Sequence, residues 1–436
     1  MTDDVASEPN TPEMIHGWAK DLFPIMRSLS GPGVRETLAY LQDLLPGLSP
    51  GLEVMAVPSG TAAFDWEVPN EWSCRAAYVE NEAGERIIDM ATHNLHVVGY
   101  SEPVDEWVDR ATLDKHLYSL PEQPDAIPYV TSYYKRRWGF CVTHEQRGSL
   151  PDGRYRVVID STLEPGVMNY GELVIPGETE REVMLSTYVC HPSMANNELS
   201  GPTVTMALAR WVAAAPRRYT YRFVFLPETI GSITYLSRNA EHLKSKLDAG
   251  FVVSCVGDDR AYSYMPSRTG KTLADRVALA ALGDAGVEFM PYSFLQRGSD
   301  ERQYCSPLID LPFASVMRSK YAEYPEYHTS LDDLELVTPR GLWGGYSMLK
   351  ACLEILEANR TYRATVPCEP QMGRRGLYPT ISQKGSADSV RSMMNVLALS
   401  DGSMDLIDLA SAVELDVLGC ARIAEKLERE GLLSAS

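Results

Sequence analysis

The stretch CHPSMANNELSG, residues 190–201, joins two apolar segments and indicates how the central part of the chain folds. The residues before it, VMLSTYVC, form an apolar run of strand length, and those after it, PTVTMALARWVAAA, form an apolar run of helix length. A histidine at the end of a strand, followed by polar residues and then by Ser-Gly opening a helix, is typical of half of a metal site. The stretch therefore predicts a site at the edge of an α/β sheet.

The same alternation of apolar strand, polar loop and helix continues along the chain. Three further buried-strand candidates are YTYRFVFLP, FVVSCVG and FASVM. Alternating strands and helices predict a sheet with helices on both faces, and ligands bind such sheets beyond the carboxyl ends of the strands.

The regions on either side of this α/β part show other sequence patterns. Residues 1–55 read as helical, and residues 56–180 contain short alternating runs separated by turns, which predicts a β-rich module. Residues 181–365 form the α/β part. Residues 366–436 begin with a connector containing Pro and Gly and then show the pattern of a winged helix.

Composition excludes several classes of function. The chain has 436 residues, of which 44% are hydrophobic and 23% charged, and its formal net charge is −19. Such a charge disfavours binding to nucleic acid or to anionic membranes. Between Ser400 and Ser436 there are eight acidic and three basic residues, a net of −5, which argues against DNA binding by the winged helix.

The eight cysteines are scattered without a CxxC pair, which fits a reducing compartment. The N-terminal residues lack the apolar core of a signal peptide, and no window approaches 18 uninterrupted apolar residues. We therefore expect a cytoplasmic protein that does not enter membranes.

Polar residues with metal-binding or acid–base chemistry follow the predicted strands. They are His191, Glu228, Asp258 or Asp259, the pair Asp300 and Glu301, and His328. Imidazoles together with carboxylates suit Zn²⁺, and a carboxylate that does not bind the metal would serve as general base. Each residue taken alone also has a structural reading, as a turn, a helix cap or a buried polar residue. Their occurrence at successive strand ends favours a site.

The ordered set resembles the zinc aminopeptidase superfamily, which includes bacterial leucyl aminopeptidase and glutaminyl cyclase. The phrases SGTAAFDWEVPNEW, CHPSMANNELSG, FLPETIGS, RGSDERQYCSP and YPEYHTSLDD are more closely similar to a bacterial aminopeptidase-like family. Its members combine a zinc-aminopeptidase-like mixed sheet flanked by helices with an inserted β-rich domain and a C-terminal winged helix. They are often encoded near polysaccharide-biosynthesis genes.

The resemblance implies roles for individual residues. His191, Asp258 and His328 match metal ligands, and Glu228 matches the general base. Three departures accompany these matches: Ser193 replaces an acid two residues after the histidine, Asn197 replaces the acid that bridges two metals, and Thr229 replaces a ligand glutamate. Losing carboxylates favours one zinc ion over two, with Glu198 and Asn197 as less secure ligands.

The expected activity is metal-dependent hydrolysis of an amide bond in a small aminoacyl or peptide-like substrate. Candidate substrate-binding residues lie in two loops near the ligands: Arg297, Asp300, Glu301, Arg302, Tyr324 and Tyr327. One alternative is an amidase, deacylase or cyclase acting on a biosynthetic intermediate at the same site. Another is a non-catalytic binding or scaffold protein with a degenerate metal site, in which the winged helix mediates formation of a homo-oligomer.

Overall fold

The computed structural model describes residues 8–49, 51–377 and 386–435, which divide into two compact units. The first unit comprises residues up to 274 together with 289–347, and the second comprises 275–288 together with residues from 348 onward. In the described part of the chain, no helix is both long and apolar enough to cross a membrane.

An eight-stranded mixed sheet forms the centre of the first unit. Its strand order is β1-β10-β12-β11-β13-β16-β14-β15. The bounds are β1 Glu53–Pro58, β10 Val167–Ile175, β12 Thr220–Leu226, β11 Glu182–Tyr188, β13 Leu247–Val252, β16 Phe313–Met317, β14 Ser263–Met265 and β15 Met290–Pro291. Strands β12, β11, β13 and β16 run parallel, so their carboxyl ends share one edge. The predicted α/β fold with a mixed sheet is therefore confirmed.

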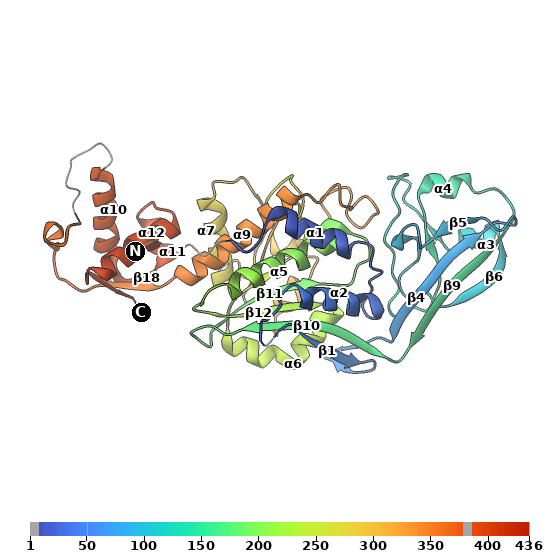
Figure 1. Cartoon of the computed structure of the whole chain (residues 1–436), viewed down its shortest axis with the longest axis horizontal. Coiled ribbons are helices and arrows are strands. Elements are labelled where there is room, and N and C mark those ends of the chain that lie inside the picture. Colours follow the sequence, from blue (N-terminus) through green and yellow to red (C-terminus); the bar gives the residue numbers. More distant parts are fainter. Residues whose placement is uncertain (1–7, 50, 378–385, 436) are drawn as a thin grey trace. The chain divides into compact units, whose positions relative to one another are not determined.

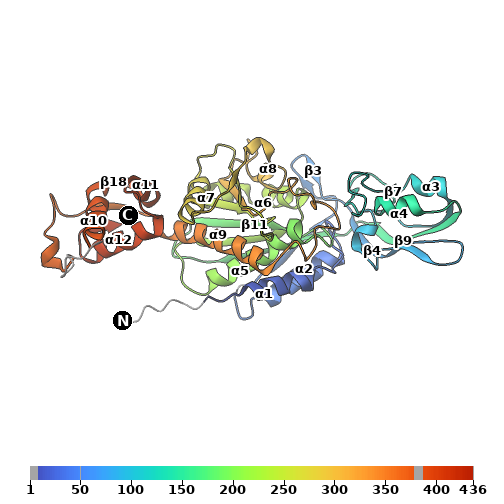
Figure 2. The same cartoon turned by 90° about the horizontal axis from the view of Figure 1, so that it is seen from above.

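Helices cover both faces of this sheet. Helix α5 (Ser200–Ala213) packs on one face beside α1 (Pro12–Leu22), and α6 (Ile230–Lys246) lies on the other face (Figures 1 and 2). Strand β11 is buried along its whole length because both faces are covered, which explains its uninterrupted apolar sequence. Helix α2 (Pro32–Asp43) packs against β10.

Gly201 explains the Ser-Gly that opens α5. A Cβ atom at this position would lie 2.3 Å from Thr187 Oγ1 and 2.5 Å from the carbonyl oxygen of Val253. The start of the helix therefore approaches the sheet more closely than any side chain permits.

The β-rich module contains a second sheet, of four strands in the order β5-β4-β9-β6. Their bounds are Arg86–Asp89, Glu71–Glu80, Arg154–Glu164 and Val104–Asp109. The limits of this module differ from the expectation in one respect. Val167–Ile175, assigned from the sequence to the β-rich part, pairs with β12 in the main sheet, because its apolar residues complete the buried face there.

The second unit contains a three-stranded sheet, β18-β17-β19, together with helices α10, α11 and α12, and it also includes most of α7 (Leu273–Asp284) and the end of α9 (Pro339–Ala358). The bounds are β17 Thr361–Ala364, α10 Ser386–Leu399, β18 Asp401–Asp405, α11 Leu406–Ala412, α12 Val417–Arg429 and β19 Leu433–Ala435. Strand β17 begins at Thr361, whereas the sequence predicts that the connector and winged helix begin at residue 366. Part of the predicted connector, residues 378–385, lies outside the described residues.

Candidate active site

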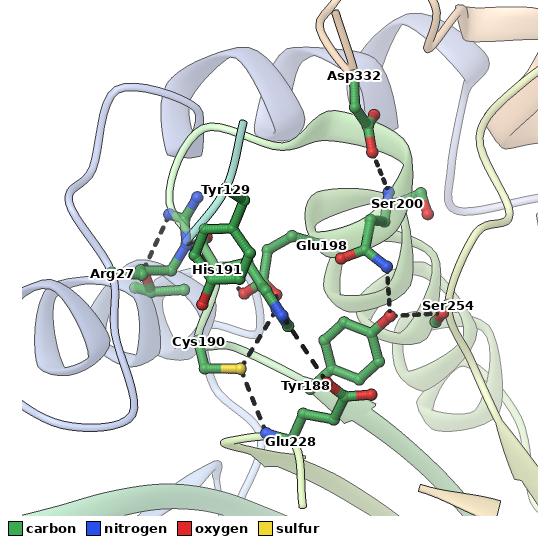
Figure 3. Close-up of polar contacts among 12 residues, drawn as sticks. Arg27, Tyr129, Tyr188, Cys190, His191, Glu198, Ser200, Glu228, Ser254 and Asp332 are labelled. Atoms are coloured by element: carbon green, nitrogen blue, oxygen red, sulfur yellow. Dashed lines mark hydrogen bonds and ion pairs between the residues drawn. The ribbon is translucent and has the colours of Figure 1, made fainter. Parts of the chain in front are cut away.

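His191 follows β11 and contacts the carboxyl group of Glu198, seven residues later in the chain. Glu198 belongs to a single π-helical turn, η2 (Ala195–Leu199), and its Oε2 lies 2.9 Å from His191 Nδ1 (Figure 3). Both residues are at most 3% exposed. Because Glu198 engages Nδ1, the other ring nitrogen, Nε2, is the one left to face a ligand.

A buried arginine from the loop between α1 and α2 completes this arrangement. Arg27 donates from Nε to the carbonyl oxygen of His191 at 3.0 Å, and the same nitrogen lies 3.6 Å from Glu198 Oε1. The Arg27 and Glu198 side chains have no exposed area. Burial raises the pKa of Glu198 to about 8, and the charge of Arg27 opposes that shift. Glu198 contacts His191 through Oε2, while its Oε1 is buried without a hydrogen-bond partner.

Glu228 follows the neighbouring strand, β12, and faces His191. Its Oε2 lies 3.8 Å from His191 Nε2, and its backbone N–H donates to Cys190 Sγ at 3.3 Å (Figure 3). The Glu228 side chain is 20% exposed, so water reaches it. Burial, and then the charge of Asp300, raise the pKa of Glu228 to about 8. This carboxyl group therefore changes its protonation state near neutral pH.

His328 comes from a loop after β16 and lies beside His191. The two ring centroids are 5.5 Å apart, and His328 Nε2 is buried without a hydrogen-bond partner. Burial lowers the pKa of both imidazoles to about 3, with Arg27 adding to the shift at His191. Both rings are therefore neutral, which is the form that binds metal ions. Tyr327 stacks on His328 with a centroid distance of 3.9 Å.

A residue of the β-rich module lies against both histidines. The ring centroid of Tyr129 is 5.1 Å from that of His191 and 5.3 Å from that of His328. Its backbone N–H donates to the carbonyl oxygen of His328 at 2.8 Å, and its hydroxyl group contacts that of Tyr133 at 3.1 Å. The β-rich module thus contributes one wall of the site. No pattern in the sequence singled out Tyr129.

Asp258 lies against η2 and the loop after β16. Its carboxylate accepts hydrogen bonds from Asn196 Nδ2, from the backbone N–H groups of Arg260 and Ser319, and from Ser319 Oγ, at 2.8–3.1 Å. Four donors occupy its acceptor positions, so the structure gives Asp258 the role of a structural anchor. Its neighbour Asp259 accepts from Thr338 Oγ1 at 2.6 Å.

Asn197 and Tyr324 are both connected to Asp332. The carboxylate of Asp332 accepts from the backbone N–H groups of Asn196 and Asn197 and from the Tyr324 hydroxyl group. This carboxylate fixes the start of η2. Asn197 donates from Nδ2 to Tyr188 OH at 2.9 Å, and its Oδ1 is buried without a partner.

The loop before α8 (Glu301–Tyr304) brings further charged side chains to the same edge. Asp300 Oδ1 accepts from the backbone N–H of Thr229 and from Ser232 Oγ, and Asp300 Oδ2 is buried without a partner. Glu301 Oε1 accepts from two loop N–H groups and from the Tyr321 hydroxyl group. Arg297 is exposed, with its guanidinium over the ring of Phe294.

Backbone strain is concentrated around the site. Ser193, Thr229, Cys255 and His328 all have positive φ values, from 45° to 66°. Such conformations are unfavourable for side chains with a Cβ and persist where the surrounding structure imposes them, which is common at functional sites.

Comparisons with known proteins agree with this architecture. A family model described as a domain of unknown function, DUF4910, matches residues 16–359, and a winged helix-turn-helix model matches residues 360–435. A Clostridium acetobutylicum protein, named for polysaccharide biosynthesis and an aminopeptidase-like domain, is 42% identical over 423 residues. The alignment covers 96% of this chain and 95% of that protein.

Solved structures show that the similarity includes the fold. A crystal structure of a candidate peptidase from Clostridium acetobutylicum is 40% identical, with a TM-score of 0.91, and covers 98% of this chain and 96% of its own. The zinc aminopeptidase of Bacillus subtilis is 12% identical, with a TM-score of 0.57, over 79% of this chain and 95% of its own.

Fold and neighbours define a protein of the aminopeptidase-like class, with a mixed α/β sheet and a C-terminal winged helix. Within that class, the chain belongs to the bacterial aminopeptidase-like family whose main domain is DUF4910.

The site contains donor atoms of the kinds that bind zinc. In the described ranges, the three donors that lie within 4.8 Å of one another come from Cys190, His191 and Glu198, but they include the Nδ1 atom that Glu198 already engages. The donors available to a metal are Nε2 of His191 and Nε2 of His328, with the Glu228 carboxylate beside them. Among the described residues, these three donors do not all lie within 4.8 Å of one another, so His191 and His328 would hold a zinc ion and Glu228 would remain beside it as a base. A second ion would need a bridging carboxylate.

Proposed function

We propose that this protein is a metal-dependent hydrolase that cleaves an amide bond in a small aminoacyl or peptide-like substrate. The observation that carries the proposal is a pair of neutral imidazoles, His191 and His328, with ring centroids 5.5 Å apart, and a partly exposed carboxyl group, Glu228, that lies 3.8 Å from His191 Nε2. The aminopeptidase-like fold supports it. A zinc ion held by His191 and His328 would polarise the scissile carbonyl group and acidify a water molecule.

Glu228 moves the protons of the reaction. Its carboxylate accepts a proton from the attacking water as the new C–O bond forms, and then gives the proton to the nitrogen as the C–N bond breaks. A pKa raised to about 8 suits both steps, because the group is neither too weak a base nor too weak an acid near neutral pH. Glu198 and Arg27 keep His191 in place during the reaction.

Asp300 favours a substrate with a free amino group. Its Oδ2 atom is a buried carboxylate oxygen without a hydrogen-bond partner, and burial first of all raises the pKa of this residue to about 6. An ammonium group placed next to Asp300 would satisfy that oxygen. Aminoacyl substrates carry such a group at the position next to the scissile amide.

Zinc content and hydrolysis of aminoacyl p-nitroanilides test this proposal. We expect the untagged protein to hold close to one equivalent of zinc, and Glu228→Gln to lose turnover by a factor of about 10² or more while it keeps the metal. Protein that binds no zinc after incubation with the ion, or a Glu228→Gln variant with unchanged turnover, contradicts the proposal. Two equivalents would show that the acids of the 300 region complete a dinuclear site.

A further inference from the structure

Arg302 is a cation placed among the acids of the site with donor capacity to spare. It lies in α8, is half-buried, and donates from a terminal nitrogen to Thr229 Oγ1 at 2.7 Å. Its Nε is buried without a hydrogen-bond partner. An N–H group in that state lacks the acceptor that buried donors normally have, and this indicates that a ligand supplies one.

Asp300 accepts a hydrogen bond from the backbone N–H of Thr229, whose hydroxyl group Arg302 contacts, so the guanidinium group lies close to Asp300 and to Glu228, the residue before Thr229. Burial raises the pKa of Glu228 and of Asp300, and Arg302 opposes the shift at both. An arginine remains charged in every protein environment, so Arg302 is a fixed positive charge at this point.

Arg302 contacts Thr229, which occupies the position of the missing metal-binding carboxylate. Thr229 follows Glu228 directly, at the position where the resemblance to zinc aminopeptidases implies a metal-binding glutamate. Its hydroxyl group accepts from Arg302, and its positive φ of 66° holds it in that direction. With Asn197 in the bridging position and Asp258 surrounded by four donors, the residues that would hold a second ion are absent or engaged.

We propose that Arg302 takes the place of a second metal ion: its guanidinium group binds the substrate oxygen that becomes negatively charged when the amide is attacked. Arg302 donates hydrogen bonds throughout and neither gains nor loses a proton, so the proton balance of the reaction stays with Glu228. The idea rests on the proposed hydrolytic function, and it adds that the active form needs one metal ion and one arginine.

Two negatively charged substrate groups, a developing oxyanion and a permanent carboxylate, suit binding by an arginine, and kinetic measurements distinguish between them. An oxyanion develops in every amide substrate, whereas a permanent carboxylate occurs in a dipeptide but not in an aminoacyl p-nitroanilide. Stabilisation of the oxyanion requires Arg302→Ala to lower kcat on both substrates by about 10²–10³-fold with KM changed little. A rise in KM confined to the dipeptide overturns the oxyanion role in favour of carboxylate binding.

The full-length zinc-loaded protein allows a matched comparison. Arg302→Ala is compared with Arg302→Lys and with Arg268→Ala, an exposed arginine that pairs with Asp310 outside the site. We expect partial recovery of Arg302→Ala when guanidinium ion is added, little recovery in the lysine variant because its ammonium group lacks the planar fork, and wild-type rates for Arg268→Ala. Wild-type kcat in Arg302→Ala overturns the proposal.

A binding measurement provides a readout that does not depend on turnover. Leucine phosphonic acid presents a tetrahedral anion, and calorimetry should show its affinity reduced about 100-fold in Arg302→Ala with zinc content unchanged. Equal affinity for both proteins overturns the proposal. If the wild-type protein binds no zinc and hydrolyses neither substrate, the proposed function fails; if it does both and Arg302→Ala behaves identically, only the inference about Arg302 fails.

Discussion

Glu198 Oε2 lies 2.9 Å from His191 Nδ1, and both residues are closed off from solvent. The acid expected two residues after the histidine is missing, because Ser193 stands there. A carboxylate from the π-helical turn therefore holds the imidazole from another direction. Such a partner fixes the tautomer and the orientation of a metal-binding histidine.

Replacing Glu198 should weaken zinc binding. We expect Glu198→Gln to lower zinc affinity by about 10–100-fold, because an amide can present either its oxygen or its NH2 group to Nδ1 and so no longer fixes the tautomer of His191. Competition with a chelating dye measures this affinity. Glu180→Gln, an exposed residue paired with Lys246, is the matched control and should bind zinc as the wild type does. Equal affinity in Glu198→Gln would show that the contact is only structural.

The alanine variant of the same residue addresses stability. Glu198→Ala leaves the buried guanidinium of Arg27 without its charged partner, and one partner removed from a buried pair costs about 3–5 kcal/mol. Urea unfolding should show a loss of this size. A loss below about 1 kcal/mol would mean that Arg27 is satisfied by its backbone acceptors, the carbonyl oxygens of His191 and Leu22.

Zinc binding should release protons, and its affinity should rise with pH. In the metal-free protein, burial, and then Asp300, place the pKa of Glu228 at about 8, so this carboxyl group is mostly protonated at pH 7. A nearby cation favours the ionised form, so apparent affinity increases with pH and levels off above about 8. Calorimetry in buffers of different ionisation enthalpy counts the protons. Glu228→Gln should release about one fewer, and an unchanged count contradicts the assignment.

Tyr129 should act through its ring. We expect Tyr129→Ala to lower zinc affinity about tenfold, because the ring contacts both imidazoles, whereas Tyr129→Phe should stay close to wild type. The spectrum of the cobalt-substituted protein reports ligand geometry and should change only in the alanine variant. If Tyr129→Phe matches the alanine variant, the hydroxyl contact with Tyr133 carries the effect instead.

The winged helix should not bind duplex DNA. Its net charge between Ser400 and Ser436 is −5, and phosphate contacts need positive charge. Fluorescence anisotropy of the full-length protein with a labelled random duplex should show no binding at about 150 mM salt up to about 10 µM protein. Salt-dependent binding in that range would overturn this expectation.

The sequence by itself determined the layered architecture and the edge at which the site lies. Strand β11 is buried throughout because helices cover both faces of its sheet. Its consecutive residues must therefore be mostly apolar, and such a run is visible in the sequence. Ser-Gly at the start of α5 likewise reflects a local close approach. Parallel strands bring their carboxyl ends to one edge, so His191 and Glu228 were expected as neighbours from their positions alone.

Only the tertiary structure decided what each polar atom contacts. The resemblance makes Glu198 a candidate ligand, whereas the fold shows that its Oε2 contacts His191 Nδ1 and that its Oε1 lies near Arg27, more than 160 residues earlier in the chain. Asp258 follows a strand as a ligand would, yet four donors from distant segments occupy its oxygens. Hydrogen-bond partners are selected by distances of a few ångströms between remote segments, and the order of residues along a chain does not encode those distances.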